Sequence, residues 1–231
     1  MGGTQARVGD FTRQLSRIRI VPVVVIDDVA AAAPLGRALL EGGLPFAEVT
    51  FRTAAALDAI RVMAQIDGLT VGAGTVLRPA QVDAALSAGA RFIVSPGFGP
   101  EVVKAAQAHG VPVITGAATA TEIQMALDYG LDVVKLFPAE AAGGLATVKA
   151  LSAPFPSVRF IPTGGITAAS APSYLAHSAV LAVGGSWMVA GDLLAARDFA
   201  EVTRRCAAAV RIAQSSAEEG RPGDEYAATQ T

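Results

Sequence analysis

The residue with the clearest chemical potential in this sequence is Lys135, a charged residue inside an otherwise apolar run. The run, residues 132–138, has the length of a buried strand and stops at Pro138, which cannot donate to a further strand ladder. In a parallel sheet, which is covered on both faces, the Lys135 amine would lie among apolar neighbours. Burial favours the uncharged amine, the form that attacks a carbonyl carbon to make a Schiff base. A structural ion pair, or a side chain that reaches the rim of the sheet, is the alternative.

A second set of polar residues occurs at alternating positions in the apolar segment that begins at Phe46. Glu48, Thr50 and Arg52 stand at i, i+2 and i+4, so one strand would turn all three to the same face. If that face is the inside of a small barrel, Glu48 lies deeper and could move a substrate proton. Arg52 lies nearer the mouth and could hold a substrate carboxylate. A structural ion pair is again the alternative.

Glycine-rich segments follow several of the other apolar runs. Residues 72–75 offer close backbone approach and the Thr75 hydroxyl, and residues 95–97 form a rigid turn around Pro96. Residues 163–166 and 183–186 each contain a Gly-Gly pair after the seventh and eighth runs. Paired loops at these places commonly form the phosphate site of a barrel, because exposed N–H groups converge there. Ordinary turns at strand-helix junctions are the alternative for each segment.

The elements that must position these residues recur regularly along the chain. Residues 4–17 have apolar side chains at helical spacing and predict a helix that caps one end of the fold. Apolar and helical segments then alternate in units of about 20–25 residues, which predicts a closed parallel (β/α)8 TIM barrel. The expected strands are 20–26, 46–51, 69–73, 91–95, 111–115, 132–136, 158–161 and 179–183. The ends of these strands should converge on one mouth.

Length and composition support a single barrel domain. A chain of 231 residues suits one large α/β domain, which we place at residues 1–215, and the polar segment 216–231 is expected to be a disordered tail. An open doubly wound sheet is the alternative, but the Gly-x-Gly-x-x-Gly segment usual after its first strand is missing.

Composition also excludes several classes of protein. With a net charge of −2 and no basic stripe, the chain is not expected to bind nucleic acid. The single cysteine, Cys206, excludes an intrachain disulfide framework, and His109 and His177 lack the spacing of a metal site, so we expect no metal. No apolar run is long enough to span a membrane, and a secretory h-region is missing. We therefore expect a cytoplasmic protein with no membrane partner.

Taken together, these motifs resemble the class I aldolases that act on 2-keto-3-deoxy-6-phosphogluconate and 4-hydroxy-2-oxoglutarate. The similar region runs from about residue 19 to residue 192 and includes 48–53, 71–77, 95–97, 135–140, 162–166 and 183–187. The resemblance implies a Schiff-base lyase of the Entner-Doudoroff pathway that cleaves the phosphorylated substrate to pyruvate and glyceraldehyde 3-phosphate. Activity on 4-hydroxy-2-oxoglutarate, which gives pyruvate and glyoxylate, is also implied. The resemblance further implies a homotrimer that needs no metal or other cofactor.

The roles of individual residues follow from this resemblance. It implies Lys135 as the Schiff-base lysine, Glu48 as the acid/base and Arg52 as the contact to the substrate carboxylate. The residues that it places around the pyruvyl group are Thr75, Pro96 and Phe137. Those that it places towards the phosphate are Thr163, Gly164, Gly165, Gly185 and Ser186. Arg78 and residues 98–99 depart from the family pattern in loops and could shift substrate preference. Residues 115–117 also depart from it, at the mouth near the fifth strand.

Other functions stay open at this point. A 2-keto-3-deoxy-6-phosphogalactonate aldolase would differ only in stereochemistry at C4, although Arg52, Thr53 and Thr163 favour the gluconate type by resemblance. A noncatalytic phosphosugar-binding barrel would keep the glycine loops without needing Lys135, Glu48 and Arg52 together. A metal-dependent aldolase or epimerase would lose its activity in chelator.

Overall fold

Strands and helices alternate along the chain, as the apolar pattern predicts. The computed structural model describes residues 2–219. Helix α1 (Gly2–Ile18) precedes the strands β1 (Ile20–Val24), β2 (Phe46–Thr50), β3 (Thr70–Gly74), β4 (Phe92–Val94), β5 (Val113–Gly116), β6 (Val133–Lys135), β7 (Arg159–Phe160) and β8 (Val183–Gly185). The helical segments that follow them are η1 (Val29–Ala31), α2 (Ala32–Glu41), α3 (Ala56–Met63), α4 (Pro79–Ser87), α5 (Pro100–Ala108), α6 (Ala120–Asp128), α7 (Gly144–Ser152), α8 (Ala171–Leu175), η2 (Trp187–Val189), α9 (Gly191–Ala196) and α10 (Phe199–Glu219). Every strand is thus followed by a helical segment, which is the repeat of a (β/α)8 fold.

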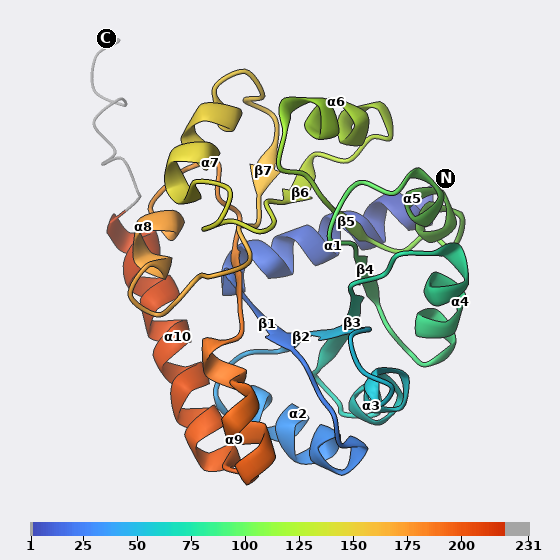
Figure 1. Cartoon of the computed structure of the whole chain (residues 1–231), viewed down its shortest axis with the longest axis vertical. Helices are drawn as coiled ribbons and strands as arrows, with labels where there is room; N and C mark the ends of the chain where they lie inside the picture. The colour runs from blue at the N-terminus through green and yellow to red at the C-terminus, as the bar shows by residue number, and fades with distance from the viewer. Residues whose placement is uncertain (1, 220–231) are drawn as a thin grey trace, which may run out of the picture.

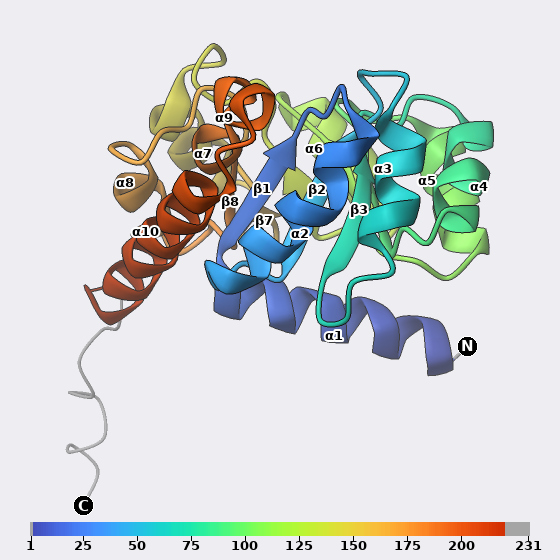
Figure 2. The same cartoon turned by 90° about the horizontal axis from the view of Figure 1, so that it is seen from below.

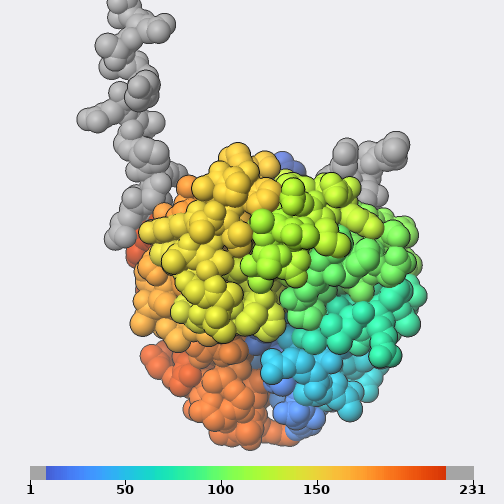
Figure 3. Space-filling model, turned by 45° about the horizontal axis from the view of Figure 1, so that its top comes forward, coloured from blue at the N-terminus to red at the C-terminus, as the bar shows by residue number. Residues whose placement is uncertain are grey.

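The eight strands form one parallel sheet that closes into a ring (Figure 1). Their order is β7-β6-β5-β4-β3-β2-β1-β8, and two isolated parallel bridges, Phe160 with Val180 and Thr163 with Gly184, join the two ends of that order. Figure 3 shows the same order on the surface, where consecutive parts of the chain lie side by side around the molecule. The predicted parallel barrel is confirmed.

Helix α1 lies across the N-terminal ends of the strands (Figure 2), which confirms the predicted capping helix. Its Phe11 ring packs on the rings of Phe92 and Phe46, with centroids 4.9 and 5.8 Å apart. Leu15, one turn further along α1, is fully buried in the same cluster. Apolar burial of this kind holds a helix in place far more strongly than its intrinsic propensity does. Among residues 2–219, no helix caps the opposite end of the barrel in this way, so the C-terminal strand ends are left for the polar residues.

Local sequence signals account for several helix boundaries. Pro79 and Pro100 are the first residues of α4 and α5, where the missing proline N–H costs no hydrogen bond. At the start of α6, the Glu122 N–H donates to the Thr119 hydroxyl, and the Glu122 carboxylate accepts the Thr119 N–H at 3.0 Å. This is the capping box that the spacing of the two residues predicts.

Strand β8 lies further along the chain than predicted. The expected strand was 179–183, whereas the observed one places Gly184 and Gly185 inside the sheet, paired with Val21 and Pro22 of β1. Packing explains these glycines: a Cβ atom on Gly184 would lie 2.3 Å from the Thr163 hydroxyl, and one on Gly185 would lie 1.9 Å from the Trp187 ring. The prediction that this Gly-Gly pair forms a loop is therefore wrong, because the neighbours that require glycine come from other parts of the chain.

The C-terminal helix α10 packs along α2 and extends past the expected start of the tail. A Cβ atom on Gly42, just after α2, would lie 2.3 Å from the Cβ atom of Cys206, so α10 approaches the backbone there closely. The tail was expected from residue 216, but α10 continues to Glu219, and residues 220–231 lie outside the described part of the chain. Within residues 2–219, no helix combines the length and the apolar character needed to span a bilayer.

Candidate active site

Lys135 and Glu48 meet inside the barrel. The Lys135 Nζ atom lies 2.8 Å from Oε1 and 3.2 Å from Oε2 of Glu48, and the two side chains are only 7% and 4% exposed. Lys135 ends β6 and Glu48 lies in the middle of β2, so the closed ring brings together residues that are far apart in sequence. All the other ion pairs formed within residues 2–219 join more exposed side chains.

The contact between these two groups suits proton transfer. A lysine must lose a proton before its nitrogen can attack a carbonyl, and a hydrogen-bonded carboxylate is a direct acceptor for that proton. The Nζ atom also lies 5.5 Å from the centroid of the Phe137 ring, which is 37% exposed. The amine thus lies between a carboxylate and an aromatic face, rather than among apolar side chains alone. Both the predicted burial and the alternative of an ion pair are therefore present.

Two glycines of β3 make room for side chains of the protein itself. A Cβ atom on Gly74 would lie 2.3 Å from the Glu48 Oε1 atom, and one on Gly72 would lie 2.3 Å from the Phe92 ring. The sequence predicts close approach to the backbone at these glycines, and the groups that approach are side chains of the protein. Gly74 provides the space in which the Glu48 carboxylate reaches Lys135.

Thr75 directly follows β3 with a strained backbone. Its φ angle is 57°, in the left-handed region, which a β-branched residue rarely adopts. Such strain persists only where the surroundings enforce it, and it clusters at functional sites. The strained position at the C-terminal end of β3 therefore supports the selection of Thr75 as a site residue.

Arg52 does not share the strand face of Glu48 and Thr50. Both of these are buried, and the Thr50 hydroxyl donates to the Val24 carbonyl at 2.9 Å. Strand β2 ends at Thr50, however, and the Arg52 N–H donates back to the Thr50 carbonyl at 2.7 Å. The Arg52 side chain is exposed beyond this turn. The expectation of one face for all three residues is wrong for Arg52, because the chain turns before a third inward position is reached.

The turn at Pro96 is held by two buried hydroxyl groups. The Gly97 carbonyl accepts hydrogen bonds from Ser95 Oγ at 2.8 Å and from Thr115 Oγ1 at 3.1 Å. A Cβ atom on Gly116 would lie 2.0 Å from the Pro96 carbonyl oxygen, so the turn packs directly on β5. Sequence reasoning selected Pro96 but missed these hydroxyls. The available signal was that Thr115 departs from the family pattern.

The loop after β7 lies beside the segment after β6 and is hydrogen-bonded to it. The Thr163 N–H donates to the Leu136 carbonyl at 2.9 Å, and the buried Thr163 hydroxyl donates to the Ile161 carbonyl at 3.3 Å. Gly164 and Gly165 have φ angles of 101° and 82°, which favour glycine. A Cβ atom on Gly164 would lie 3.3 Å from the Phe137 ring, so the loop borders the ring beside Lys135.

Ser186 is the first residue after β8, and its side chain is exposed. Its hydroxyl makes no capping hydrogen bond to η2, so it can donate to a ligand. Of the two predicted glycine loops, only the one with Gly164 and Gly165 is a loop. The other segment can contribute through Ser186, while Gly185 is covered by Trp187.

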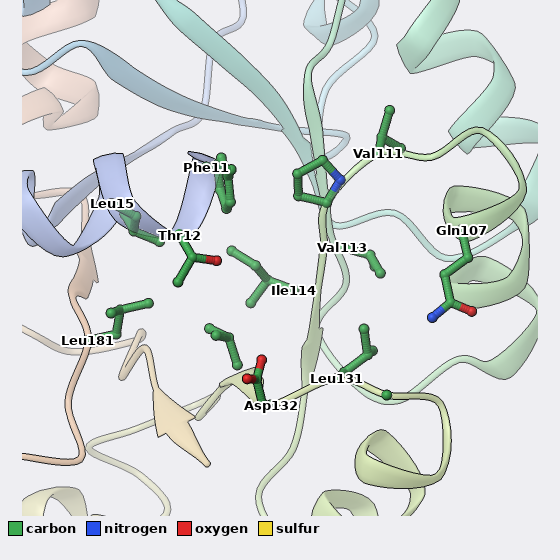
Figure 4. Close-up of a pocket in the computed structure, with 13 residues that line it drawn as sticks. Phe11, Thr12, Leu15, Gln107, Val111, Val113, Ile114, Leu131, Asp132 and Leu181 are labelled. Atoms are coloured by element: carbon green, nitrogen blue, oxygen red, sulfur yellow. The ribbon is translucent and has the colours of Figure 1, made fainter. Parts of the chain in front are cut away.

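A cavity of about 260 Å³ lies at the other end of the barrel, between α1 and the sheet. Its walls are mostly apolar, and Figure 4 shows among them Phe11, Leu15, Val113, Ile114, Leu131 and Leu181. None of the predicted site residues borders it. Because chemistry in (β/α)8 barrels gathers at the C-terminal ends of the strands, we read this cavity as space left between the capping helix and the sheet.

The two histidines of the chain have structural partners. His109 Nε2 lies 2.8 Å from the Asp83 carboxylate on the surface, and His177 Nδ1 accepts the Ala179 N–H at 3.2 Å. Within the described residues, no group of three or more His, Cys, Asp or Glu side chains is placed to hold a metal ion.

Known proteins of one family are similar to this chain in sequence and in fold. A family model described as "Aldolase: KDPG and KHG aldolase" matches residues 11–205. A 2-dehydro-3-deoxy-phosphogluconate aldolase of Treponema pallidum (strain Nichols) is 52% identical over 190 residues, which cover 82% of this chain and 90% of the relative. A KHG/KDPG aldolase of Escherichia coli (strain K12) is 44% identical over 196 residues, covering 84% and 92%. The crystal structure of a 2-keto-3-deoxy-6-phosphogluconate aldolase of Zymomonas mobilis ZM4 with 3-phosphoglycerate has a TM-score of 0.83 and 43% identity, covering 87% and 95%.

The buried pair generates a prediction about stability. Glu48→Leu leaves a buried ammonium without its partner and should lower the free energy of unfolding by about 3–5 kcal/mol. Adding Lys135→Met should restore most of that loss, because two apolar residues pack without a desolvation cost. Urea unfolding of the two single variants and the double variant measures both effects. Glu101→Leu, which breaks an exposed pair with Lys104, is the control and should change stability little. Wild-type stability of Glu48→Leu would contradict the expected energetics.

Proposed function

The chain belongs to the KDPG and KHG aldolase family of class I lyases, and we propose on that basis that it cleaves 2-keto-3-deoxy-6-phosphogluconate to pyruvate and glyceraldehyde 3-phosphate. The same site would join the two products in the reverse direction. The observation that carries the proposal is the buried contact of 2.8 Å between Lys135 and Glu48. It supplies a nucleophile and a proton acceptor at one point inside the barrel.

The reaction begins at the amine of Lys135. The ammonium passes a proton to the Glu48 carboxylate, and the free amine attacks the C2 ketone of the substrate. Loss of water gives a protonated imine, which can accept an electron pair. A base then removes the proton of the C4 hydroxyl, the C3–C4 bond breaks, and its electrons move to the imine to form an enamine. Protonation at C3 and hydrolysis release pyruvate and regenerate the Lys135 amine.

Glu48 is the proposed acid/base because its carboxylate already contacts the nitrogen at which the first and last proton transfers occur. Its burial keeps water away from the pair, which strengthens the electrostatic interaction. We assign Arg52 to the substrate carboxylate, because its side chain is exposed just beyond the C-terminal end of β2. Thr75, Pro96 and Phe137, at the ends of β3, β4 and β6, are the proposed surroundings of the pyruvyl group.

The phosphate is proposed to bind at the loop after β7 and at Ser186. Backbone N–H groups of a glycine-rich loop bind anions without obstruction by side chains. The loop after β7 consists of Thr163, Gly164 and Gly165. The Ser186 hydroxyl, which makes no capping hydrogen bond, adds a donor at the end of the neighbouring strand β8. Gly185 is left out of the proposed phosphate site, because the Trp187 ring covers it and leaves no space for a ligand there.

A second activity is favoured by one specific observation. The Escherichia coli relative, 44% identical, is named for both substrates of the family, so we also propose cleavage of 4-hydroxy-2-oxoglutarate to pyruvate and glyoxylate. A phosphogalactonate aldolase would share Lys135 and Glu48 and differ only at C4, and turnover of the two C4 epimers side by side separates these possibilities. A noncatalytic barrel has no use for a buried pair that is costly to desolvate.

Two further proposals concern the whole protein, and family membership supports the first of them. We propose a homotrimer of 23.4 kDa chains, which light scattering measures directly. We keep the cytoplasmic location as a prediction, on the grounds of cysteine usage.

The covalent intermediate should form on Lys135. Borohydride added together with pyruvate should inactivate the enzyme and add the mass of a reduced pyruvyl group to the peptide that contains Lys135. Peptide mass spectrometry locates the adduct, and borohydride without pyruvate is the control. Lys104 and Lys149, both on the outer helices, should stay unlabelled. Labelling there instead of at Lys135 would overturn the assignment.

Replacing the proposed acid/base should slow the chemistry more than it weakens binding. Glu48→Gln keeps the size of the side chain but removes the proton acceptor, so kcat should fall by about 10²–10⁴. Some Schiff base should still be trapped with pyruvate. By contrast, Arg52→Lys should mostly raise KM, because it replaces a planar fork with a point charge. Steady-state kinetics of both variants, with Glu101→Gln as control, separates the effect on kcat from the effect on KM. Turnover of Glu48→Gln near the wild-type rate would reduce Glu48 to a structural ion-pair partner.

The proposed phosphate contact is tested most cleanly at Ser186. Ser186→Ala removes a hydroxyl without placing new atoms, and it should raise KM for the phosphorylated substrate by about tenfold. KM for 4-hydroxy-2-oxoglutarate, which has no phosphate, should stay unchanged. Larger residues at Gly165 or Gly185 are poorer tests, since a Cβ atom there would meet Glu140 or Trp187. Equal changes for both substrates in Ser186→Ala would count against a phosphate role.

A further inference from the structure

The segment after β6 and the loop after β7 are joined beyond the ends of their strands. The Ala139 N–H donates to the Thr163 carbonyl at 2.8 Å, and the Glu140 N–H donates to the Gly164 carbonyl at 3.1 Å. The ladder between the two strands is thus continued by loop residues. The position of Gly164 therefore depends on where the backbone of Glu140 lies.

The side chain of Glu140 also supports the next glycine. A Cβ atom on Gly165 would lie 2.7 Å from both Cβ and Cγ of Glu140, so the aliphatic part of Glu140 lies directly against Gly165. At the end of the same side chain, the Glu140 Oε1 atom accepts a hydrogen bond from the Tyr174 hydroxyl at 2.7 Å. Glu140 is therefore fixed at both ends, by Gly164 at its backbone and by Tyr174 at its carboxylate.

Tyr174 provides a rigid anchor for this arrangement. It lies in α8, beside the start of α7, and it is only 2% exposed. Burial, and then the hydrogen bond to Glu140, raise the pKa of Tyr174 well above its usual value, so the hydroxyl stays protonated and donates. A Cβ atom on Gly144, the first residue of α7, would lie 3.0 Å from this hydroxyl. In Figures 1 and 2, α7 and α8 lie side by side at this place.

A glycine loop needs such support if it is to bind an anion well. Gly164 and Gly165 both have positive φ angles and no side chains of their own to hold them. Glycine loses more conformational freedom on ordering than any other residue, and a ligand that must order its loop binds less tightly. Glu140 carries a negative charge that would repel a phosphate, so direct contact with the substrate is not its role. Its contacts are instead with the loop and with Tyr174.

We propose that Glu140 and Tyr174 are a pair of positioning residues that hold the Gly164–Gly165 loop in the shape that receives the phosphate of the substrate. This inference rests on the proposed function, and it assigns the pair no contact with reacting atoms. The pair acts on binding of the phosphorylated substrate and leaves the chemistry at Lys135 unaffected.

Tyr174→Phe tests the pair by removing one hydroxyl. KM for 2-keto-3-deoxy-6-phosphogluconate should rise about tenfold while kcat stays within about twofold, because a hydrogen bond to a charged group is lost outside the reacting centre. KM for 4-hydroxy-2-oxoglutarate and borohydride trapping of pyruvate at Lys135 should not change. Tyr129→Phe, which removes the hydroxyl of a tyrosine that packs on Phe98, is the matched control. An unchanged KM, or equal losses on both substrates, would overturn the proposal.

Variants of Glu140 separate the hydrogen bond from the charge. Glu140→Gln keeps an acceptor for Tyr174 and the aliphatic cover of Gly165, so KM for the phosphorylated substrate should stay near the wild-type value. Glu140→Ala loses both and should raise that KM at least as much as Tyr174→Phe does. The double variant of Glu140→Ala with Tyr174→Phe should be no worse than Glu140→Ala alone, since the two residues act as one unit. Additive losses would contradict a shared role.

A binding measurement keeps the pair testable if the proposed function itself fails. In that case the wild-type chain would show neither turnover nor a pyruvate adduct on Lys135. Titration of the wild-type chain and of Tyr174→Phe with inorganic phosphate then decides the question. Weaker phosphate binding by Tyr174→Phe would support the positioning role, and equal binding would reject it.

Discussion

The constraint on which the rest of the site depends is that a lysine buried inside a barrel needs a partner. The Lys135 ammonium cannot be left among apolar groups without a large cost, and the Glu48 carboxylate at 2.8 Å compensates for it. The contact requires a closed ring of strands, which brings β2 and β6 together across the interior. It also requires glycine at position 74, because a Cβ atom there would collide with the Glu48 carboxylate. The pair that stabilises the buried charge is also the pair that can exchange a proton during Schiff-base formation.

Glycine has two different functions around this site. Gly72, Gly74, Gly184 and Gly185 make room for the side chains of Phe92, Glu48, Thr163 and Trp187, respectively. Gly164 and Gly165 instead adopt a backbone conformation that favours glycine, in a loop supported by Glu140. In the sequence both kinds appear as the same short glycine-rich motif. At the glycines that make room for side chains, packing alone requires the residue to be glycine. Substitutions at those positions therefore disturb the fold as well as the site.

The regular features of the fold followed from the sequence because they depend on local patterns. Periodic apolar residues predicted α1 and the alternation of strands and helices, and the spacing of Thr119 and Glu122 predicted the start of α6. The features that depend on contacts between distant segments were not predictable in this way. Strand β8 was placed too early because its pairing with β1 and its cover by Trp187 come from elsewhere in the chain. The helical turn beyond the expected start of the tail is a smaller error of the same kind.

The sequence by itself selected the candidate residues for the proposed chemistry: one lysine in a buried strand, a carboxylate at an inward position and glycines at the strand ends. Tertiary structure alone decided how they are arranged. It placed Glu48 against Lys135, moved Arg52 out of the strand into a turn, and assigned Ser95, Thr115, Glu140 and Tyr174 to the support of site loops. The physical reason is that residue type and periodicity fix which face of an element a side chain occupies. The distance between two such faces is set by the closure of the sheet and by packing between segments far apart in the chain.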